Sequence, residues 1–142
     1  SQTAAASNAV GYIGREVNAS GVRSELVNGK ASWMFQLDRD APEVTVTIKD
    51  NEGNVVHTET GALKAGTGVY NWDGMGNNGK PMPEGTYSIT IDARDADGGR
   101  VTAVTQMTGK VTGVDMTGSE PVLLVGNARV NLSSVMSVVA TD

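Results

Sequence analysis

The loop at residues 71–87, N-W-D-G-M-G-N-N-G-K-P-M-P-E-G-T-Y, carries side chains suited to bind a cation. An EF-hand loop places oxygen ligands at its first, third and fifth positions, a glycine at the sixth and an acid at the twelfth. Counted from Asp73, Asn77 is fifth and Glu84 is twelfth, but the third position is a methionine and the sixth an asparagine. The pattern fails at two positions, so no metal site is predicted here.

The same loop is rich in turn-forming residues. Asp-Gly and Asn-Gly pairs favour tight turns, because glycine accepts a positive φ and Asp or Asn side chains accept hydrogen bonds from nearby amides. The two prolines stiffen the chain and prevent strand pairing. The aromatic residues at the two ends are expected to pack in the core. We interpret the segment as a conformation-fixing loop with the structural signature Trp72, Asp73, Gly74, Gly79, Pro83, Gly85 and Tyr87.

The remaining side chains of this loop are candidates for contact with a partner protein, because loops on a rigid scaffold carry recognition. These candidate contact residues are Met75, Asn77, Asn78, Lys80, Met82 and Glu84. A second exposed loop, G-A-L-K-A-G-T-G at residues 61–68, is a further candidate. It lacks the G-K-[ST] order of a phosphate-binding loop, and no helical pattern follows it.

Catalytic residues are not evident. The single histidine, His57, lies in a predicted strand, and no G-x-S-x-G nucleophile motif occurs. The acids cluster in turns, although sequence alone leaves open a carboxylate pair of the glycosidase kind. We therefore expect no enzyme and no cofactor.

Composition excludes several classes of function. The chain has 11 basic and 16 acidic residues, a net charge of −5, which argues against nucleic acid as a partner. No apolar run is long enough to span a bilayer, so membrane insertion is not expected. The absence of cysteine excludes disulfides, thiolate zinc sites and cysteine nucleophiles.

Period-two alternation predicts an all-β fold. Residues 31–37 and 43–49 alternate apolar with polar or small side chains, as half-buried strands do. Turns rich in Asp, Asn and Gly at 50–54 and 93–99 each separate two strands. About seven strands between residues 31 and 107 match a small sandwich, and the others lie near 55–60, 68–72, 86–92 and 100–107.

The two ends of the chain are expected to cooperate. Residues 1–9 are expected to be a frayed helix end or a loose tail, and residues 10–17 a strand bent or bulged at its two glycines. Short strands are predicted at 109–116, 121–126 and 128–132, with a helical turn leading into a strand at 133–139. Neither end alone can bury a core. Residues 10–29 and 108–142 are therefore predicted to form one small barrel, with the sandwich of residues 30–107 inserted between them.

The loop and its flanks resemble the flagellar hook-capping family, FlgD. W-D-G-x(4)-G-x-x-M-P-E-G-T-Y at 72–87 resembles the family's W-D-G…G…L-P-x-G-x-Y signature. Y-I-G-R-E-V at 12–17 and G-K-V-T-G-V-D at 109–115 resemble its N-terminal and C-terminal segments, so the likeness runs from about residue 10 to 139. Two positions depart from the signature: Gly76 stands where the family usually has Asp or Asn, and Met82 where it usually has Leu.

The resemblance implies a fibronectin-III-like or Ig-like sandwich inserted into a Tudor- or SH3-like barrel. It implies a non-enzymatic scaffold that is exported through the flagellar channel, sits at the tip of the growing hook and guides hook subunits into place. It also implies a ring of copies in the full-length protein and an N-terminal segment for export, of which residues 1–9 would be a remnant. The alternative is an Ig-like binding module of a secreted adhesin or carbohydrate-active protein, which requires an exposed aromatic platform.

Overall fold

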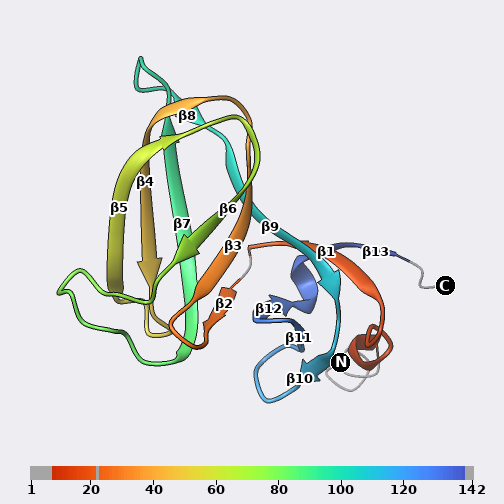
Figure 1. The fold of residues 1–142 in the computed structure, drawn as a ribbon. Helices are drawn as coiled ribbons and strands as arrows, with labels where there is room; N and C mark the ends of the chain where they lie inside the picture. The colour runs from red at the N-terminus through yellow and green to blue at the C-terminus, as the bar shows by residue number, and fades with distance from the viewer. Residues whose placement is uncertain (1–7, 22, 140–142) are drawn as a thin grey trace. The chain divides into compact units, whose positions relative to one another are not determined.

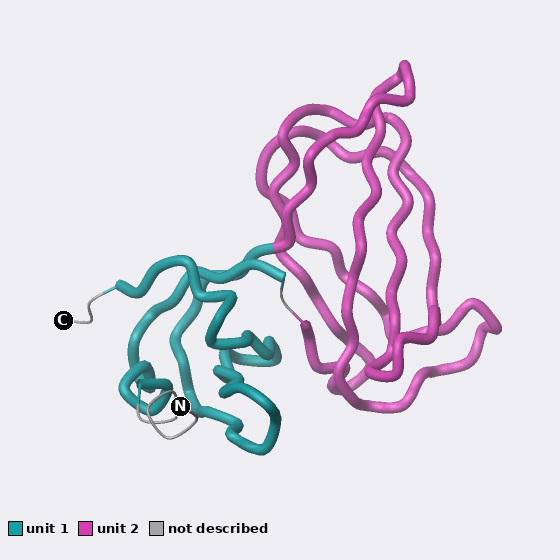
Figure 2. Tube along the Cα trace, turned by 180° about the vertical axis from the view of Figure 1, so that it is seen from behind, with its two compact units in different colours: residues 1–22, 106–142 teal, residues 23–105 magenta. Residues whose placement is uncertain are grey.

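The computed structural model describes residues 8–21 and 23–139, and nearly all of its regular structure is β-strand (Figure 1). Contacts divide the chain into two compact units, residues 1–22 with 106–142 and residues 23–105 (Figure 2). The second unit is thus inserted in sequence between the two segments of the first. Among the described residues, no helix has the length and apolar character needed to cross a membrane.

Residues 23–105 form a two-sheet sandwich. One sheet has the strand order β9-β3-β6 and the other the order β2-β7-β4-β5, with the short strand β8 beside β7. The strand bounds are β2 (Arg23–Leu26), β3 (Ala31–Leu37), β4 (Ala41–Lys49), β5 (Val55–Leu63), β6 (Gly66–Trp72), β7 (Gly85–Arg94), β8 (Arg100–Val101) and β9 (Ala103–Lys110). The predicted all-β sandwich is confirmed, with β9 continuing into the other unit.

Alternation along these strands separates core from solvent as the sequence predicts. On β4, Val44, Val46 and Ile48 are at most 5% exposed, while Thr45 and Thr47 between them are half-buried. On β3, Trp33 and Leu37 are each 2% exposed. Successive side chains of a strand point to opposite faces, so one face of each sheet supplies the core.

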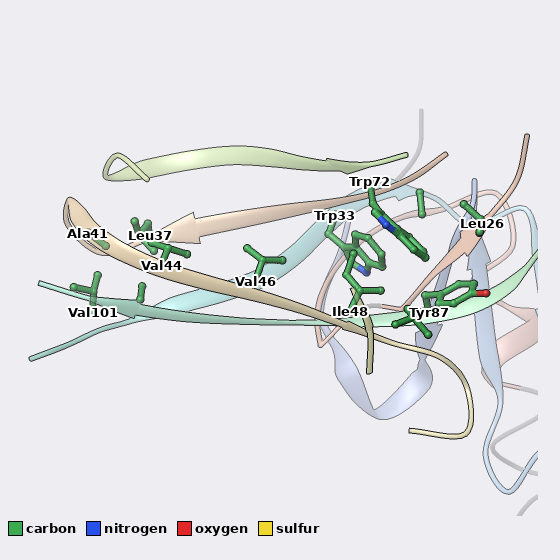
Figure 3. Packing of buried hydrophobic residues seen from close by; sticks show 13 residues of the cluster. Leu26, Trp33, Leu37, Ala41, Val44, Val46, Ile48, Trp72, Tyr87 and Val101 are labelled. Atoms are coloured by element: carbon green, nitrogen blue, oxygen red, sulfur yellow. The ribbon is translucent and has the colours of Figure 1, made fainter. Parts of the chain in front are cut away.

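The core of the sandwich has an aromatic end and an aliphatic end. Figure 3 shows the aromatic end built from Leu26, Trp33, Ile48, Trp72 and Tyr87. The opposite end holds the smaller side chains of Leu37, Ala41, Val44 and Val101. The loop at residues 73–84 leaves and re-enters the sandwich at the aromatic end, between Trp72 and Tyr87.

The other unit is a small barrel of two antiparallel ladders. In one, β1 (Glu16–Ser20) pairs with β13 (Val135–Val139) and with the later part of β9. In the other, β10 (Gly113–Asp115), β11 (Val122–Val125) and β12 (Ala128–Asn131) pair in order, followed by the 3-10 turn η1 (Leu132–Ser134). They enclose a separate core of Ala9, Val17, Ala19, Val111, Leu123, Val125 and Val130. The predicted second hydrophobic nucleus, made from both ends of the chain, is confirmed.

The strand predicted over residues 10–17 is wrong for most of its length. Residues 8–10 are helical, residues 11–14 form turns, and β1 begins only at Glu16. The amide of Tyr12 donates to the carbonyl of Ala9 at 3.0 Å, and Gly14 has a φ of 88°. Local turn bonds and a left-handed glycine therefore compete with strand pairing. The predicted loose tail, residues 1–9, lies outside the described residues except for residues 8 and 9, of which Ala9 is fully buried.

The division by contacts falls at residues 22/23 and 105/106, whereas the sequence predicts limits at 29/30 and 107/108. The difference at the first limit arises from β2. This strand pairs with β7, with Ser24 opposite Tyr87 and Leu26 opposite Gly85. Residues 23–29 therefore group with the sandwich.

Candidate functional site

The candidate site is the loop at residues 73–84, whose two ends are fixed by aromatic rings. Trp72 and Tyr87 are 2% and 4% exposed, and their ring centroids lie 5.0 Å apart with planes inclined at 67°. This edge-to-face contact joins the last residue of β6 to the third residue of β7 (Figure 3). The loop thus starts and ends on one packed pair of side chains.

Both rings also bind the loop backbone. The indole Nε1 of Trp72 donates to the carbonyl of Met75 at 3.0 Å. The hydroxyl of Tyr87 donates to the carbonyl of Pro83 at 2.6 Å, and burial followed by the nearby charge of Asp50 raises the pKa of Tyr87. Each ring is therefore both a core side chain and a clamp on one arm of the loop.

The loop closes on itself between its arms. The amide of Met82 donates to the carbonyl of Gly74 at 2.8 Å, and the amide of Gly76 donates to the carbonyl of Lys80 at 2.9 Å. At the tip, the side chain of Asn78 accepts from the amide of Lys80 at 3.0 Å. These bonds form a short hairpin-like excursion with a defined conformation.

One arm of the loop covers the edge of β5. The amide of Asn77 donates to the carbonyl of Val56 at 2.8 Å, and its side-chain oxygen accepts from the amide of Thr58 at 3.0 Å. Asn77 thus takes the place of a residue of a neighbouring strand in hydrogen bonding to β5. Exposed edge groups attract other strands, so this contact protects β5 from mispairing.

The six candidate contact residues divide into three kinds. Asn77 holds β5, and the carboxylate of Glu84 accepts from the amide of Asn28 at 3.0 Å. The side chains of Met75 and Met82 are half-buried, Met82 against the sandwich core. The other two, Asn78 and Lys80, are exposed at the tip, and the side chain of Asn78 bonds only within the loop, to the amide of Lys80.

The two departures from the FlgD signature are neighbours in space. A Cβ atom built on Gly76 would lie 3.0 Å from the sulfur of Met82 and 3.3 Å from the carbonyl oxygen of Val56. The long thioether of Met82 thus occupies the space that a side chain at position 76 would need. The small residue and the large residue compensate for each other.

His57 belongs to a polar clasp made with Trp72, Glu59 and Tyr70. Its ring stacks on Trp72 with centroids 6.2 Å apart, and its Nε2 lies 3.6 Å from Oε1 of Glu59. The same carboxylate oxygen accepts from the hydroxyl of Tyr70 at 2.5 Å. Burial, and then this bond to Glu59, raise the pKa of Tyr70. The clasp joins β5 to β6, the neighbouring edges of the two sheets.

This clasp is not among the features predicted from the sequence. Two short patterns in the sequence could have indicated the clasp: H-x-E on β5 and Y-x-W on β6. In each pattern the two named residues are two positions apart, so both side chains lie on one face of their strand. Asn28, which donates to the loop, was also missed, although Asn-Gly between two short strands is a strong hairpin signal.

Metal and carbohydrate binding find little support in the part of the chain that is described. No three His, Asp or Glu side chains converge there to hold an ion. All six aromatic residues fall in the described ranges, and each is buried or half-buried: Tyr12, Trp33, Phe35, Tyr70, Trp72 and Tyr87. An adhesin or carbohydrate-active module needs exposed rings, so that alternative is not favoured.

The fold and the loop together define a class: a fibronectin-III-like sandwich, inserted into a small Tudor-like barrel and carrying a W-D-G loop fixed by two rings. Residues 21–97 match the family model described as the FlgD Ig-like domain. The match covers more than half of the chain, and the chain belongs to the FlgD family.

Relatives agree with this assignment. The chain is 38% identical over 74 residues to the basal-body rod modification protein FlgD of Salmonella typhimurium, covering 51% of this chain and 32% of that protein. It is 35% identical over 99 residues to the protein of the same name from Escherichia coli, covering 66% of this chain and 43% of that protein. The chain thus spans less than half the length of these relatives.

Solved structures extend the likeness across both units. FlgD from P. aeruginosa superposes with a TM-score of 0.62 at 27% identity, covering 90% of this chain and 98% of that chain. FlgD from Xanthomonas campestris, whose structure was described for insights into the hook capping essential for flagellar assembly, gives a TM-score of 0.59 at 23% identity. That alignment covers 95% of this chain and 99% of the other, and it supports the fold.

Proposed function

We propose that the chain is the core of a non-enzymatic scaffold that caps the growing bacterial flagellar hook and guides hook subunits into the polymer. The observation that carries the proposal is the match of residues 21–97 to the FlgD Ig-like domain. The structural likeness to FlgD from P. aeruginosa over 90% of the chain supports it further. Two compact units, each with its own core, suit a scaffold, and no group of three metal-ligating side chains converges in the described residues.

The proposal includes a place and partners. The protein would be exported through the flagellar channel and act outside the cell at the hook tip. It would contact the hook subunit and further copies of itself in a ring-like cap, and a segment N-terminal to this core would engage the export machinery. A closed ring requires a head-to-tail interface between copies.

Within this role, the tip of the loop at residues 73–84 is the proposed contact with the hook subunit. Asn78 and Lys80 project from a backbone that is fixed by the bonds of Trp72 and Tyr87. A rigid loop loses little conformational entropy on binding. Lys80 also presents an exposed cation on a chain whose net charge is −5, which favours an acidic partner surface.

Complementation tests this contact. The full-length gene carrying Lys80→Glu is introduced into a strain that lacks the protein, and motility and hooks seen by electron microscopy are scored. Loss of a central contact typically costs about 2 kcal/mol or more, which lowers the affinity more than tenfold, so the number of hooks per cell is expected to fall. The matched control is Lys49→Glu, an exposed lysine on β4.

Two outcomes separate the levels of the proposal. Normal hooks with Lys80→Glu would reject the tip as the contact while leaving the capping role intact. Normal hooks in a strain from which the gene is deleted would reject the capping role itself. A motile Lys49→Glu strain is required to show that charge reversal alone is harmless.

A further inference from the structure

Five described strands lie at sheet edges, and four of these edges are short or protected. In the sandwich the edge strands are β6 in one sheet and β5 and the two-residue β8 in the other, and in the barrel they are β13 and β10. Asn77 covers part of β5, which also carries the charge of Glu59. β13 has a bulge opposite Asn18 and Ala19, and β10 has only three residues. Bulges, charges, covers and short length are the usual defences of an edge.

The remaining edge, β6, has none of these defences in its own residues. Its seven residues, G-T-G-V-Y-N-W, pair with β3 in unbroken register from Ala31 opposite Trp72 to Leu37 opposite Gly66. It contains no charge and no proline, and no described strand pairs with its open side. Val69, at its centre, is 54% exposed. Alternate N–H and C=O groups of such a strand point outward and are free to accept another strand.

We propose that β6 is a self-association edge, which pairs antiparallel with β6 of a second copy of this chain about a two-fold axis at Val69. In this register Val69 lies opposite Val69 of the second copy, and Thr67 lies opposite Asn71. The sheet β9-β3-β6 then continues into its symmetry mate. Two-fold pairing of this kind uses the same surface on both partners.

Charge favours a second copy at this edge. Copies with a net charge of −5 repel one another, and the repulsion is weakest across surfaces without acids. β3 and β6 carry no charged residue of their own, and the carboxylate that the clasp brings to β6, Glu59, accepts from Tyr70 and lies 3.6 Å from Nε2 of His57. Lys64 precedes β6 and Asp73 follows it, so antiparallel pairing places the cation of one copy near the anion of the other at both ends. Parallel pairing would place like charges together.

Apolar contact adds to the backbone bonds. Met34 lies opposite Val69 on the same outer face of the sheet and is half-buried. In the pair of copies, Met34 and Val69 and their symmetry mates form one continuous apolar stripe. Cross-strand pairs of this kind stabilise a sheet modestly, so the association is weak and depends on concentration.

Sedimentation equilibrium of the 142-residue chain, from about 10 µM to about 1 mM, tests the proposal over the range of weak association. The mass is expected to rise from 14.7 kDa toward twice that value. Val69→Lys places two cations opposite each other and is expected to weaken the association at least tenfold. The control is Val55→Lys on β5, where the valine is 52% exposed. A monomer throughout the range, or equal loss with both variants, overturns the proposal.

Cysteine cross-linking tests the register without weakening the edge. The chain has no cysteine, so Val69→Cys introduces a single thiol. Opposed Cα atoms in an antiparallel pair are about 4.5–5.5 Å apart, within disulfide range. In Thr67→Cys the two thiols are offset by about four residues, about 13 Å. Oxidation is expected to give the covalent dimer at least tenfold faster with Val69→Cys, and equal rates overturn the register. The test uses isolated protein, so its result is independent of the hook role.

Discussion

The side chain of Asn77 accepts a hydrogen bond from the amide of Thr58 at 3.0 Å, while its own amide donates to the carbonyl of Val56 at 2.8 Å. Asn77 therefore makes both hydrogen bonds, one donated and one accepted, that a residue of a neighbouring strand would make with the edge of β5. This contact fixes the middle of a loop whose ends are fixed by Trp72 and Tyr87.

Replacing Asn77 with Ala should loosen the loop and uncover the edge of β5. The Thr58 amide loses its acceptor, and the loss of one such hydrogen bond costs about 1 kcal/mol. Hydrogen exchange at Thr58 is expected to accelerate about tenfold or less, whereas the backbone bond of residue 77 persists. The exposed Asn51→Ala serves as the control. Unchanged exchange at Thr58 would show that the side-chain bond is not formed in solution.

Alanine substitutions at two glycines of the loop distinguish the cost of backbone strain from the cost of a steric clash. Gly74 and Gly79 have φ values of 76° and 78°. A Cβ on Gly74 would lie 3.0 Å from Cδ1 of Leu26, whereas a Cβ on Gly79 has no atom within 4 Å. Gly79→Ala should cost about 1–2 kcal/mol from the left-handed backbone alone.

Gly74→Ala should cost more, by about 1–3 kcal/mol, because the added methyl group crowds the core at Leu26. Denaturant unfolding, followed by tryptophan fluorescence from Trp33 and Trp72 in the sandwich, measures both variants. Equal destabilisation by the two substitutions would mean that Leu26 gives way freely.

Alternation allowed most of the sandwich to be predicted from sequence. Val44, Val46 and Ile48 are β-branched residues at a strict period of two, and hydrophobic burial leaves only one register for such a strand. The turn at 50–54 could also be predicted from sequence, because it is stabilised locally: Asp50 accepts from the amides of Glu52 and Asn54 at 2.9 Å each. In this hairpin, local hydrogen bonding and hydrophobic burial favour the same structure.

The failures occurred where local chemistry competed with periodicity. Residues 10–17 contain apolar residues at strand-like spacing, but turn bonds such as that from Arg15 to the carbonyl of Tyr12 form instead. The sequence prediction includes the residues of β2 in the barrel, because it identifies no strand between residues 18 and 30. The Asn28-Gly29 turn, with φ values of 54° and 74°, is a hairpin signal that joins β2 to β3.

For the candidate site, sequence indicated the turn residues but not their distant partners. Asp73 accepting from the amide of Met75 at 3.0 Å is a local Asx turn, which its own neighbours specify. The bonds of Asn77 to β5 and of Asn28 to Glu84 join residues far apart in the chain. Such contacts depend on the packing of the whole sandwich. The assignment of the loop as a contact site stays a prediction.

Tyr70→Phe should remove the hydrogen bond that joins β6 to Glu59 of β5. The variant should lose about 1 kcal/mol at neutral pH, because the carboxylate loses one donor and remains solvated. Removing the hydroxyl leaves the packing of the ring in place. Unfolding in denaturant at pH 7 measures the loss, with Tyr12→Phe in the barrel as the control.

The same bond predicts a dependence on alkaline pH. Burial and Glu59 raise the pKa of Tyr70 above its ordinary value of 10.0. Its contribution is therefore complete below pH 10 and is lost as the pH rises above that value. The pKa of Tyr87 is raised too, so Tyr70→Phe should reduce the alkaline loss of stability without abolishing it. An identical alkaline profile in the variant would contradict the assignment.

Acid should act on the barrel through Asp115. Its carboxylate accepts from the hydroxyl of Thr117 at 2.6 Å and from the guanidinium of Arg129 at 2.5 Å. These bonds, that of Thr117 first, hold the pKa of Asp115 well below its ordinary value of 3.8. The stabilisation is therefore complete at neutral pH and begins to be lost only as the pH falls below about 4. Asp115→Asn should be less stable at pH 7 and should lose less stability between pH 4 and pH 2.

Amide exchange of β10–β12 measures this loss of stability, with the exposed Asp97→Asn of the sandwich as the control. An acid profile of the barrel that is the same in Asp115→Asn and in the unsubstituted chain would show that another carboxylate governs it.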